Sequence, residues 1–416
     1  MKLYPMLKSL DFERMTGTAG EERGIQVIAG HLKKMGFEPK VETFEFEGFD
    51  PGTATISDGE KSFEATPYGL CPDVSVSGKL IYLENLDAIK YNPGIYDDAI
   101  VLFYHSDSRL YSLSKLAKIK AFIGISAPFK SAYSYSHRQN LPAEESFPIA
   151  MMRYDDAEKL IKKAGKTVSL TIKQKVEKRI GHNIVLDIKG SGKDDSLTLL
   201  VGHYDTVARS HGACDNAAGS VCMIKAIEQF KKKPPLRDLR VIWFSGEELG
   251  LLGSYAYVKQ HEEELKKRCK LVVNVDLAGD PIGRNVLFCL GTKELKGYAS
   301  GILKEAGLLF SDKLSLYSSD CIPFSVHEIP SLNLARVGGK ALYHGHTDQD
   351  VAKHCSEQGL TDVYLATKTI LSRVLNADMY PVAEGIDDSL RENLERYLWH
   401  STLEKPELKW TEKYKK

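Results

Sequence analysis

The stretch "LLVGHYDTVARSHGACDNAAGS", residues 199–220, joins an apolar run to a cluster of side chains that could bind a metal ion. His203 and Asp205 follow the apolar run directly, and Asp215 precedes a patch of small residues. A short apolar run bounded by glycine and polar residues is typical of a buried strand. In sheets covered by helices, ligands bind beyond the carboxyl ends of the strands. The stretch therefore predicts a buried strand whose end carries a functional site.

The same arrangement recurs through the second half of the chain. The apolar runs "NIVLDIKG", "LRVIWFSG", "KLVVNVDL", "NVLFCLG" and "IPSLNLA" alternate with helical patterns, among them residues 221–231, 254–268 and 292–306. Apolar strands that alternate with helices indicate a sheet covered on both faces. We therefore expect the α/β class, with a mixed, mostly parallel sheet sandwiched by helices.

Most candidate site residues lie at or just past the ends of these predicted strands. Glu247 and Glu248 follow "VIWFSG", Asp276 follows "LVVNV", and His346 lies in "YHGHTDQD", after the last strand. Because parallel strands end at the same edge of a sheet, we expect these side chains to meet the histidine and aspartates of the opening stretch.

Imidazoles and carboxylates without thiolates suit Zn²⁺ and, less selectively, Co²⁺ or Mn²⁺. The candidates outnumber the ligands of one tetrahedral zinc with an open position, but a bridging carboxylate would divide them between two ions. Asp215 suits bridging because its two oxygens can face two ions. Of the neighbours Glu247 and Glu248, one can ligate while the other acts as general base. Asp205 is placed to accept the second ring N–H of His203.

Several neighbouring residues have a simpler interpretation. A single His-x-Asp or Glu-Glu pair is usually an exposed surface pair, so the metal hypothesis depends on the fragments together. His211 and His344 lie near the motifs, and we interpret both as loop residues or as part of the pocket rim. Cys214 and Cys321 adjoin acidic residues but have no specified partner base, and we interpret them as packing residues.

The length of the chain and a change of sequence pattern near residue 50 predict more than one domain. At 416 residues, about two to three domains of ordinary size are expected. From about residue 50, short β-like segments are separated by Gly, Pro, Asp and Ser. We expect a catalytic domain over residues 1–48 and 180–380, an inserted β-rich domain over 49–179, and a C-terminal helix and tail over 381–416.

Composition narrows the classes of partner. The chain is 43% hydrophobic and 27% charged, with 56 basic and 56 acidic residues, which is typical of a soluble globular protein. This balance gives no reason to expect nucleic acid or a membrane surface and favours a small or peptidic substrate; oligomers stay possible. There is no leader-like segment, and the seven cysteines contain no CxxC pair, so a cytoplasmic location is expected.

Five motifs together resemble the co-catalytic di-zinc aminopeptidase family, whose relatives include leucyl-type aminopeptidases, glutamate carboxypeptidase and the transferrin receptor. The motifs are "GHYDTV", "GACDNAAGS", "FSGEELGLLGS", "NVDLAG" and "HTDQD", in order over residues 183–350. The resemblance implies two zinc ions, replaceable by Co or Mn. It makes His203 and Asp276 ligands of one ion, Glu248 and His346 ligands of the other, Asp215 the bridge and Glu247 the general base.

Two further segments extend the resemblance. "SSDCIPFSVHEIPSL", residues 318–332, is similar to the segment that lines the family's substrate pocket, with Asp320 and Phe324 at matching positions. The end of the insertion, "FPIAMMRYDDAEKLIKKAGKTVSLTIKQ", resembles the last strand, helix and strand of a protease-associated domain. The resemblance therefore implies an inserted protease-associated-like domain near the metal cleft.

The leading hypothesis is a metalloaminopeptidase that hydrolyses N-terminal residues from peptides, with a two-zinc-activated water and Glu247 as general base. A carboxypeptidase or dipeptidase of the same family is the alternative, and it would need a cation for the substrate carboxylate, with Arg336 or Arg284 as candidates. A single-zinc glutaminyl cyclase and a non-catalytic, receptor-like scaffold are the remaining alternatives.

Overall fold

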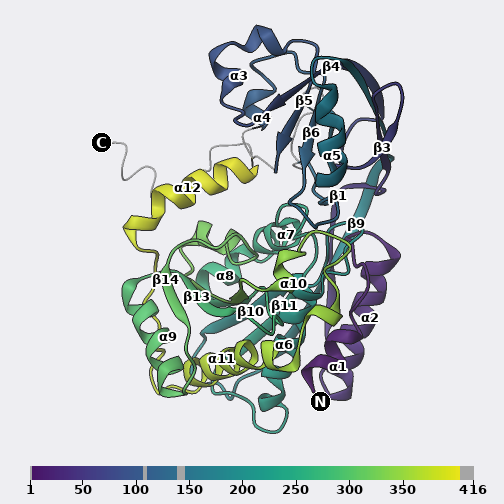
Figure 1. The fold of residues 1–416 in the computed structure, drawn as a ribbon. Coiled ribbons are helices and arrows are strands. Elements are labelled where there is room, and N and C mark those ends of the chain that lie inside the picture. The colour runs from purple at the N-terminus through teal and green to yellow at the C-terminus, as the bar shows by residue number, and fades with distance from the viewer. Residues whose placement is uncertain (1, 106–109, 138–145, 403–416) are drawn as a thin grey trace.

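The computed structural model describes residues 2–105, 110–137 and 146–402, and its centre is one eight-stranded sheet (Figure 1). In spatial order the strands are β1 (Lys40–Phe49), β9 (Val176–Ile188), β11 (Asp238–Phe244), β10 (Leu197–His203), β12 (Cys269–Val275), β15 (Ser331–Val337), β13 (Arg284–Leu290) and β14 (Ser311–Leu314). The predicted α/β class is confirmed, because helices lie on both sides of this sheet.

The middle of the sheet is parallel and its flanks are antiparallel. β10 pairs in parallel with β11 and β12, and β12 pairs in parallel with β15. β1 pairs antiparallel with β9, and β9 with β11, whereas β13 pairs antiparallel with β15 and in parallel with β14. The carboxyl ends of β10, β11 and β12 therefore meet at one edge, as the sequence predicts.

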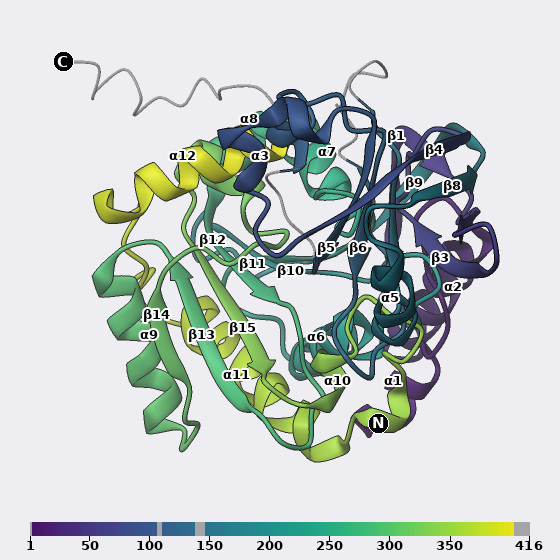
Figure 2. The same cartoon turned by 45° about the horizontal axis from the view of Figure 1, so that its top comes forward.

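Two groups of helices cover the two faces. The first group packs in one apolar cluster: α1 (Leu3–Lys8), α2 (Ala19–Lys34), α6 (Ala218–Ile227), α9 (Lys293–Glu305) and α11 (Glu357–Leu375). The second group packs in another: α7 (Leu252–Gln260), α8 (Glu262–Arg268) and α12 (Asp388–Thr402). Along β10 the side chains alternate, since Leu199 and Val201 join the second cluster and Leu200 joins the first. Figure 2 shows α9 beside β13 and β14, at the edge away from β1.

Three elements differ from the sequence prediction. The expected helix over residues 254–268 is two helices, which meet at His261. The backbone of His261 is not helical, and its ring stacks on Tyr257 at 4.2 Å while Nε2 lies 2.8 Å from the Glu42 carboxylate of β1. The strands β3 (Ser62–Pro67) and β14 were not predicted, because both are short and carry too many polar residues to form an apolar run.

A separate closed barrel lies between β1 and β9 in the sequence. Its strands in order are β2 (Thr53–Ser57), β3, β7 (Ile149–Met152), β6 (Ala121–Ile125), β5 (Ala99–Tyr104), β4 (Val74–Leu83) and β8 (Thr167–Lys173). The barrel has its own apolar cluster, and its short helices are α3 (Ala88–Tyr91), α4 (Leu110–Leu113) and α5 (Tyr154–Leu160). All seven strands fall inside the predicted insertion, residues 49–179. Its assignment as a protease-associated domain stays a prediction.

The C-terminal helix packs on the sheet domain rather than on the barrel core. Leu390, Leu394 and Leu398 of α12 are buried in the same cluster as α7 and α8, as their helical spacing suggests. The predicted tail, residues 403–416, lies outside the described residues. No helix in the described part of the chain has the length and apolar character needed to cross a bilayer.

Candidate metal centre

The sheet brings the predicted site residues together at one edge. β10 ends at His203, and Asp276 directly follows β12, its parallel neighbour. Glu247 lies three residues beyond the end of β11, on the other side of β10. Three neighbouring parallel strands thus deliver these side chains to the same place, as the strand pattern predicts.

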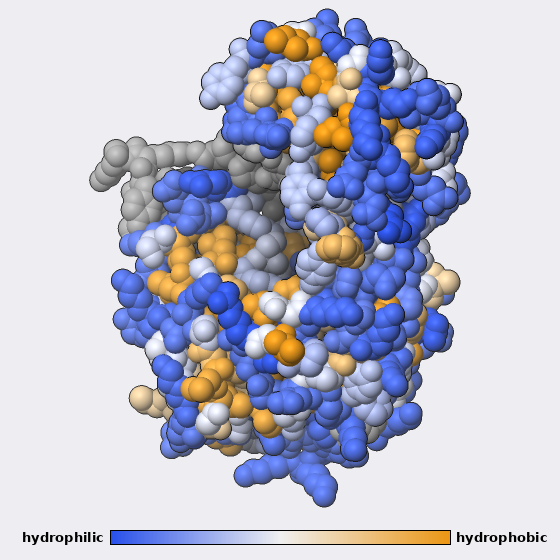
Figure 3. Space-filling view, in the orientation of Figure 1, coloured by the Kyte–Doolittle hydropathy of each residue, from blue (hydrophilic) through white to orange (hydrophobic). Residues whose placement is uncertain are grey.

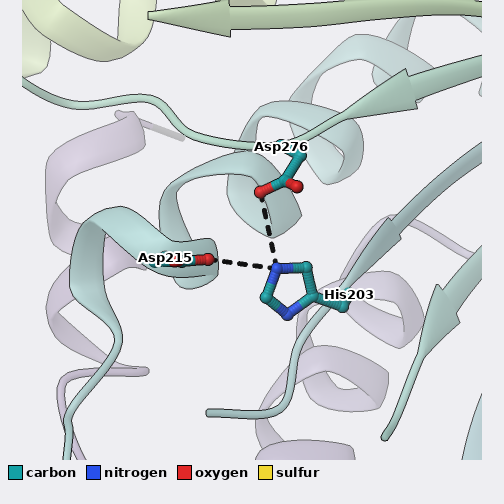
Figure 4. A group of neighbouring side chains, drawn as sticks. All are labelled: His203, Asp215 and Asp276. Atoms are coloured by element: carbon teal, nitrogen blue, oxygen red, sulfur yellow. Dashed lines mark ion pairs between the residues drawn. The ribbon is translucent and has the colours of Figure 1, made fainter. Parts of the chain in front are cut away.

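The first cluster of donors is built on His203. Its Nε2 lies 3.2 Å from Asp215 Oδ1 and 3.4 Å from Asp276 Oδ1, and Figure 4 shows both carboxylates directed at this ring nitrogen. The His203 side chain is 1% exposed, and neither of its ring nitrogens has a hydrogen-bond partner among the described residues. Buried polar atoms without partners are uncommon and require an explanation such as a bound ion.

The second cluster of donors shares Asp215 with the first. His346 Nε2 lies 3.4 Å from Asp215 Oδ2 and 3.2 Å from Glu248 Oε2. The two oxygens of Asp215 therefore face two different imidazoles. In each cluster the donor atoms lie within 4.8 Å of one another.

Asp350 and Arg14 hold the loop that carries Asp215. Asp350 accepts hydrogen bonds from the backbone N–H of Cys214 at 2.8 Å and of Asp215 at 3.1 Å. Burial raises the pKa of Asp350 to about 7, although these two amides act in the opposite direction. The buried guanidinium of Arg14 donates to the carbonyls of His211 and Gly212 at 2.7 and 2.9 Å.

The small residues after Asp215 allow α6 to approach the sheet closely. Asn216 Nδ2 donates to the carbonyl of Val275 at the end of β12, and Asn216 Oδ1 accepts from the amide of Gly219. A Cβ added at Gly219 would lie 2.2 Å from Asn216 Oδ1 and 2.6 Å from the Val275 carbonyl. The glycine in "NAAGS" is therefore required by the contact between helix and strand.

Asp205 lies behind His203 with its carboxylate fixed by other elements. Its Oδ1 is 3.4 Å from His203 Nδ1 and accepts from the Glu247 amide at 3.3 Å, while Oδ2 accepts from the Thr16 hydroxyl at 3.1 Å. The Thr16 hydroxyl also accepts from the amide of Gly246 at 2.8 Å. The N-terminal segment before α2 therefore supports the site, which no sequence pattern indicated.

Glu247 belongs to neither donor cluster but lines the same cavity. Burial raises its pKa well above the ordinary value, and Glu248, Asp276 and Asp320 add to the rise against the opposing charge of His203. Asp320 is fully buried, and burial raises its pKa to about 7. The site thus concentrates carboxylates, whose burial and mutual charge raise the pKa values of Glu247 and Asp320.

The cavity at this edge has a volume of about 310 Å³, at the lower end of the range for small-molecule sites. Its walls come from the strand-end loops and from α12: Asp215, Glu247, Glu248, Gly250, Leu251, Asp276, Leu277, Tyr317, Ser318, His346 and Tyr397. The hydroxyls of Tyr397 and Ser318 are 2.5 Å apart, so the C-terminal helix closes one side of the cavity. In the space-filling view, a recess lies between the barrel and the sheet domain (Figure 3).

The lining residues that the structure describes include no lysine or arginine. Arg336, one predicted candidate for a carboxylate-binding cation, donates instead to the carbonyl of Asp280 at 2.6 Å and to the side chain of Asn285 at 2.8 Å. Arg284, the other candidate, is an exposed residue of β13 and does not line this cavity.

The remaining candidates lie outside the two donor clusters. His211 pairs with Asp11 at 3.0 Å, and His344 stacks on His354 at 5.3 Å. Phe324 is buried against Phe244 and is not among the residues that line the cavity. All seven cysteines are free and buried, and burial raises the pKa of Cys214 and Cys321, as expected for packing residues.

Known proteins with related sequences are aminopeptidases by name. The chain is 26% identical to aminopeptidase YwaD of Bacillus subtilis over 377 residues, which cover 83% of this chain and 78% of that protein. It is 24% identical to a probable leucine aminopeptidase 2 of Aspergillus oryzae over 281 residues, 64% of this chain and 55% of that protein. The match with the fungal protein thus spans about half of its length.

Solved structures share the fold. The zinc aminopeptidase BSAP of Bacillus subtilis superposes with a TM-score of 0.74 at 22% identity, covering 93% of this chain and 98% of that one. A Peptidase M28 precursor from Shewanella amazonensis has a TM-score of 0.76 at 19% identity, with 93% and 95% covered. Residues 183–370, which contain both donor clusters, match the sequence model of Peptidase family M28. The comparisons therefore support peptidase family M28 for the region over residues 183–370.

Proposed function

We propose that this protein is a zinc-dependent aminopeptidase that hydrolyses the N-terminal residue of peptides, with two zinc ions in the centre. The names of its relatives support the activity, and the likeness to BSAP, a zinc aminopeptidase by name, supports zinc. The observation that carries the proposal is the cavity lining, which has carboxylates and one imidazole but, among the described residues, no lysine or arginine.

The donor set fits two zinc ions. Zinc binds nitrogen and oxygen at about 2.0–2.2 Å, so the donors of a tetrahedral site lie about 3.3–3.6 Å apart. The four distances from the two imidazoles to their carboxylates are 3.2–3.4 Å. The Nε2 of buried His203, which faces both carboxylates without a hydrogen bond, supports the same assignment. We assign His203 and Asp276 to one ion, Glu248 and His346 to the other, and Asp215 to both.

Glu247 is our candidate for the general base. When bound, the ions supply Lewis acidity, which polarises a carbonyl and acidifies water. The Glu247 carboxylate takes a proton from the water that attacks the scissile carbonyl and gives it to the leaving amine. The same carboxyl must hold the proton between the two steps. Asp205 keeps the His203 ring in its orientation.

The lining of the cavity gives no cation for a substrate with a free carboxylate. The charges of Asp215, Glu248 and Asp276 would be offset by the zinc ions that they hold. The described lining residues include no lysine or arginine for the terminal carboxylate that a carboxypeptidase or a dipeptidase must bind. The complete pair of donor clusters favours a two-ion enzyme over a single-zinc cyclase or a scaffold without metal.

One short leucine peptide, with a free or an acetylated amino terminus, tests the proposal. We expect the zinc-loaded protein to release leucine from the free peptide only and to lose this activity after chelation. Equal cleavage of both peptides would instead indicate an endopeptidase or a carboxypeptidase. No cleavage of either would favour the cyclase, dipeptidase or scaffold alternatives.

A further inference from the structure

We propose that the barrel is part of the metal centre, because its loop over residues 126–137 positions His346 through Ser134 and Tyr135. The loop follows β6, packs on the barrel's apolar cluster through Tyr133 and contacts the sheet domain at His346. The inference rests on the proposed function, since it takes His346 as a zinc ligand. Ser134 and Tyr135 are positioning residues, which act only through the histidine.

The loop contacts His346 through both backbone and side chain. The Ser134 N–H donates to the His346 carbonyl at 2.9 Å. The rings of Tyr135 and His346 meet edge to face, with centroids 5.4 Å apart and an interplanar angle of 69°. His346 has a φ of 60°, in the left-handed region that non-glycine residues occupy only when their surroundings hold them there. The two contacts supply that restraint at the residue that carries the donor nitrogen.

A second set of contacts fixes the segment just before His346. The Tyr343 hydroxyl donates to the Pro128 carbonyl at 2.6 Å. The Lys130 ammonium lies 4.3 Å from the centroid of the Tyr343 ring and donates to the Tyr133 hydroxyl at 2.6 Å. The loop therefore contacts both ends of the turn over residues 343–346.

The loop is itself anchored to the barrel and to the main sheet. The Gly69 N–H donates to the Tyr135 carbonyl, and the His137 N–H donates to the Gly69 carbonyl, both at 2.8 Å. A Cβ at Gly69 would lie 2.0 Å from the ring of Phe49, the last residue of β1. This close packing leaves little room for the loop to shift relative to the sheet that carries the other zinc donors.

The two histidines of the centre are thus oriented by different parts of the chain. His203 has a carboxylate of its own domain, Asp205, 3.4 Å from Nδ1. His346 has the Tyr135 ring and the Ser134 amide of the inserted barrel. Groups that orient metal-binding histidines typically change metal affinity by about 10- to 100-fold when removed. Loss of the barrel contacts should therefore lower the affinity for the zinc ion that His346 binds and leave the other ion in place.

The test is zinc content in the full chain after dialysis against graded chelator. We expect wild type to hold two ions. Tyr135→Ala should lose one of them at a chelator concentration about 10- to 100-fold lower than wild type does. Tyr135→Phe keeps the ring and should behave as wild type. Tyr154→Ala removes another barrel tyrosine, one that packs on Tyr104, and should also behave as wild type. Thermal unfolding monitors the fold of each variant.

The outcomes separate this inference from the proposed function. A wild-type protein without tightly bound zinc would refute the proposed function, whatever the variants do. A two-zinc wild type together with a Tyr135→Ala variant that keeps both ions at wild-type affinity would overturn the role of the loop. Should Tyr135→Ala fail to fold, Tyr135→Leu keeps apolar packing without the aromatic ring and is expected to lose the same ion; retention of both ions would again overturn the role.

Discussion

Replacement of Glu247 by glutamine separates a general base from a metal ligand. Glutamine keeps the shape of the side chain and removes its ability to take a proton. Glu247 lines the cavity but belongs to neither donor cluster, so the variant should bind as much zinc as wild type. General base catalysis contributes about 10²- to 10⁴-fold, and kcat should fall by that factor, which corresponds to about 3–5 kcal/mol in the activation barrier.

The same substitution has a predictable effect on the stability of the metal-free protein. Burial and the charges of Glu248, Asp276 and Asp320 hold the folded-state pKa of Glu247 above its unfolded value. The folded state then binds the proton more tightly, so ionisation of this group costs stability as the pH rises above its unfolded pKa of about 4.3. Glu247→Gln should therefore stabilise the metal-free protein at pH 7 and have little effect at pH 4.

Two assays show whether Glu247 is a general base or a metal ligand. Release of leucine at saturating peptide gives kcat, and elemental analysis gives zinc per chain. Glu248→Gln is the matched control. Glu248 Oε2 lies 3.2 Å from His346 Nε2, in the second donor cluster, so this variant should lose one zinc ion. The assignment of base and ligand would be refuted if Glu247→Gln lost zinc while Glu248→Gln retained both ions.

Three further predictions follow from individual contacts. His346→Ala should lose zinc and activity while His344→Ala, which removes a ring stacked on His354, should stay near wild type in the leucine assay; equal losses would show that the wrong histidine was chosen. Asp350→Asn replaces one of two acceptor oxygens by a donor facing a backbone N–H, and urea unfolding should show a loss of about 1.5–3 kcal/mol, whereas an unchanged midpoint would contradict the role of Asp350. Burial lowers the pKa of His137 to about 4 in the barrel, against about 6.5 unfolded, so the unfolded state binds the proton first and stability falls from pH 7 to 4.5 by about 2–3 kcal/mol. His137→Gln should remove that part of the pH dependence in urea unfolding, and a variant with the wild-type pH dependence would exclude His137 as its source.

Much of the sheet domain could be predicted because its strands are continuous apolar runs. The run before His203 and the run before Asp276 each form a buried strand, and parallel pairing then places their ends together. Once the strands are expected to pair in parallel, motifs that are far apart in the sequence are expected to lie in one cluster. The strand β14 shows where this reasoning fails, because "SDKL" at the sheet edge is half exposed and has no apolar pattern.

The supports of the site could not be predicted because they depend on tertiary contacts of the backbone. Thr16 reaches Asp205 from a loop before α2, and Arg14 binds carbonyl groups of the loop before Asp215. Ser134 contributes only a backbone N–H to His346, which any residue other than proline could provide. Tyr397 enters the cavity wall through the packing of α12. None of these residues stands in a pattern that distinguishes it from its neighbours.

The most direct test of the central claim is the zinc content of wild type and of Asp215→Ala by elemental analysis. The claim is that one carboxylate, 3.2 Å from His203 Nε2 and 3.4 Å from His346 Nε2, joins two zinc sites. We predict two ions per chain in wild type and loss of both in the variant, together with loss of leucine release. A wild type with a single ion, or a variant that keeps two, would contradict the account.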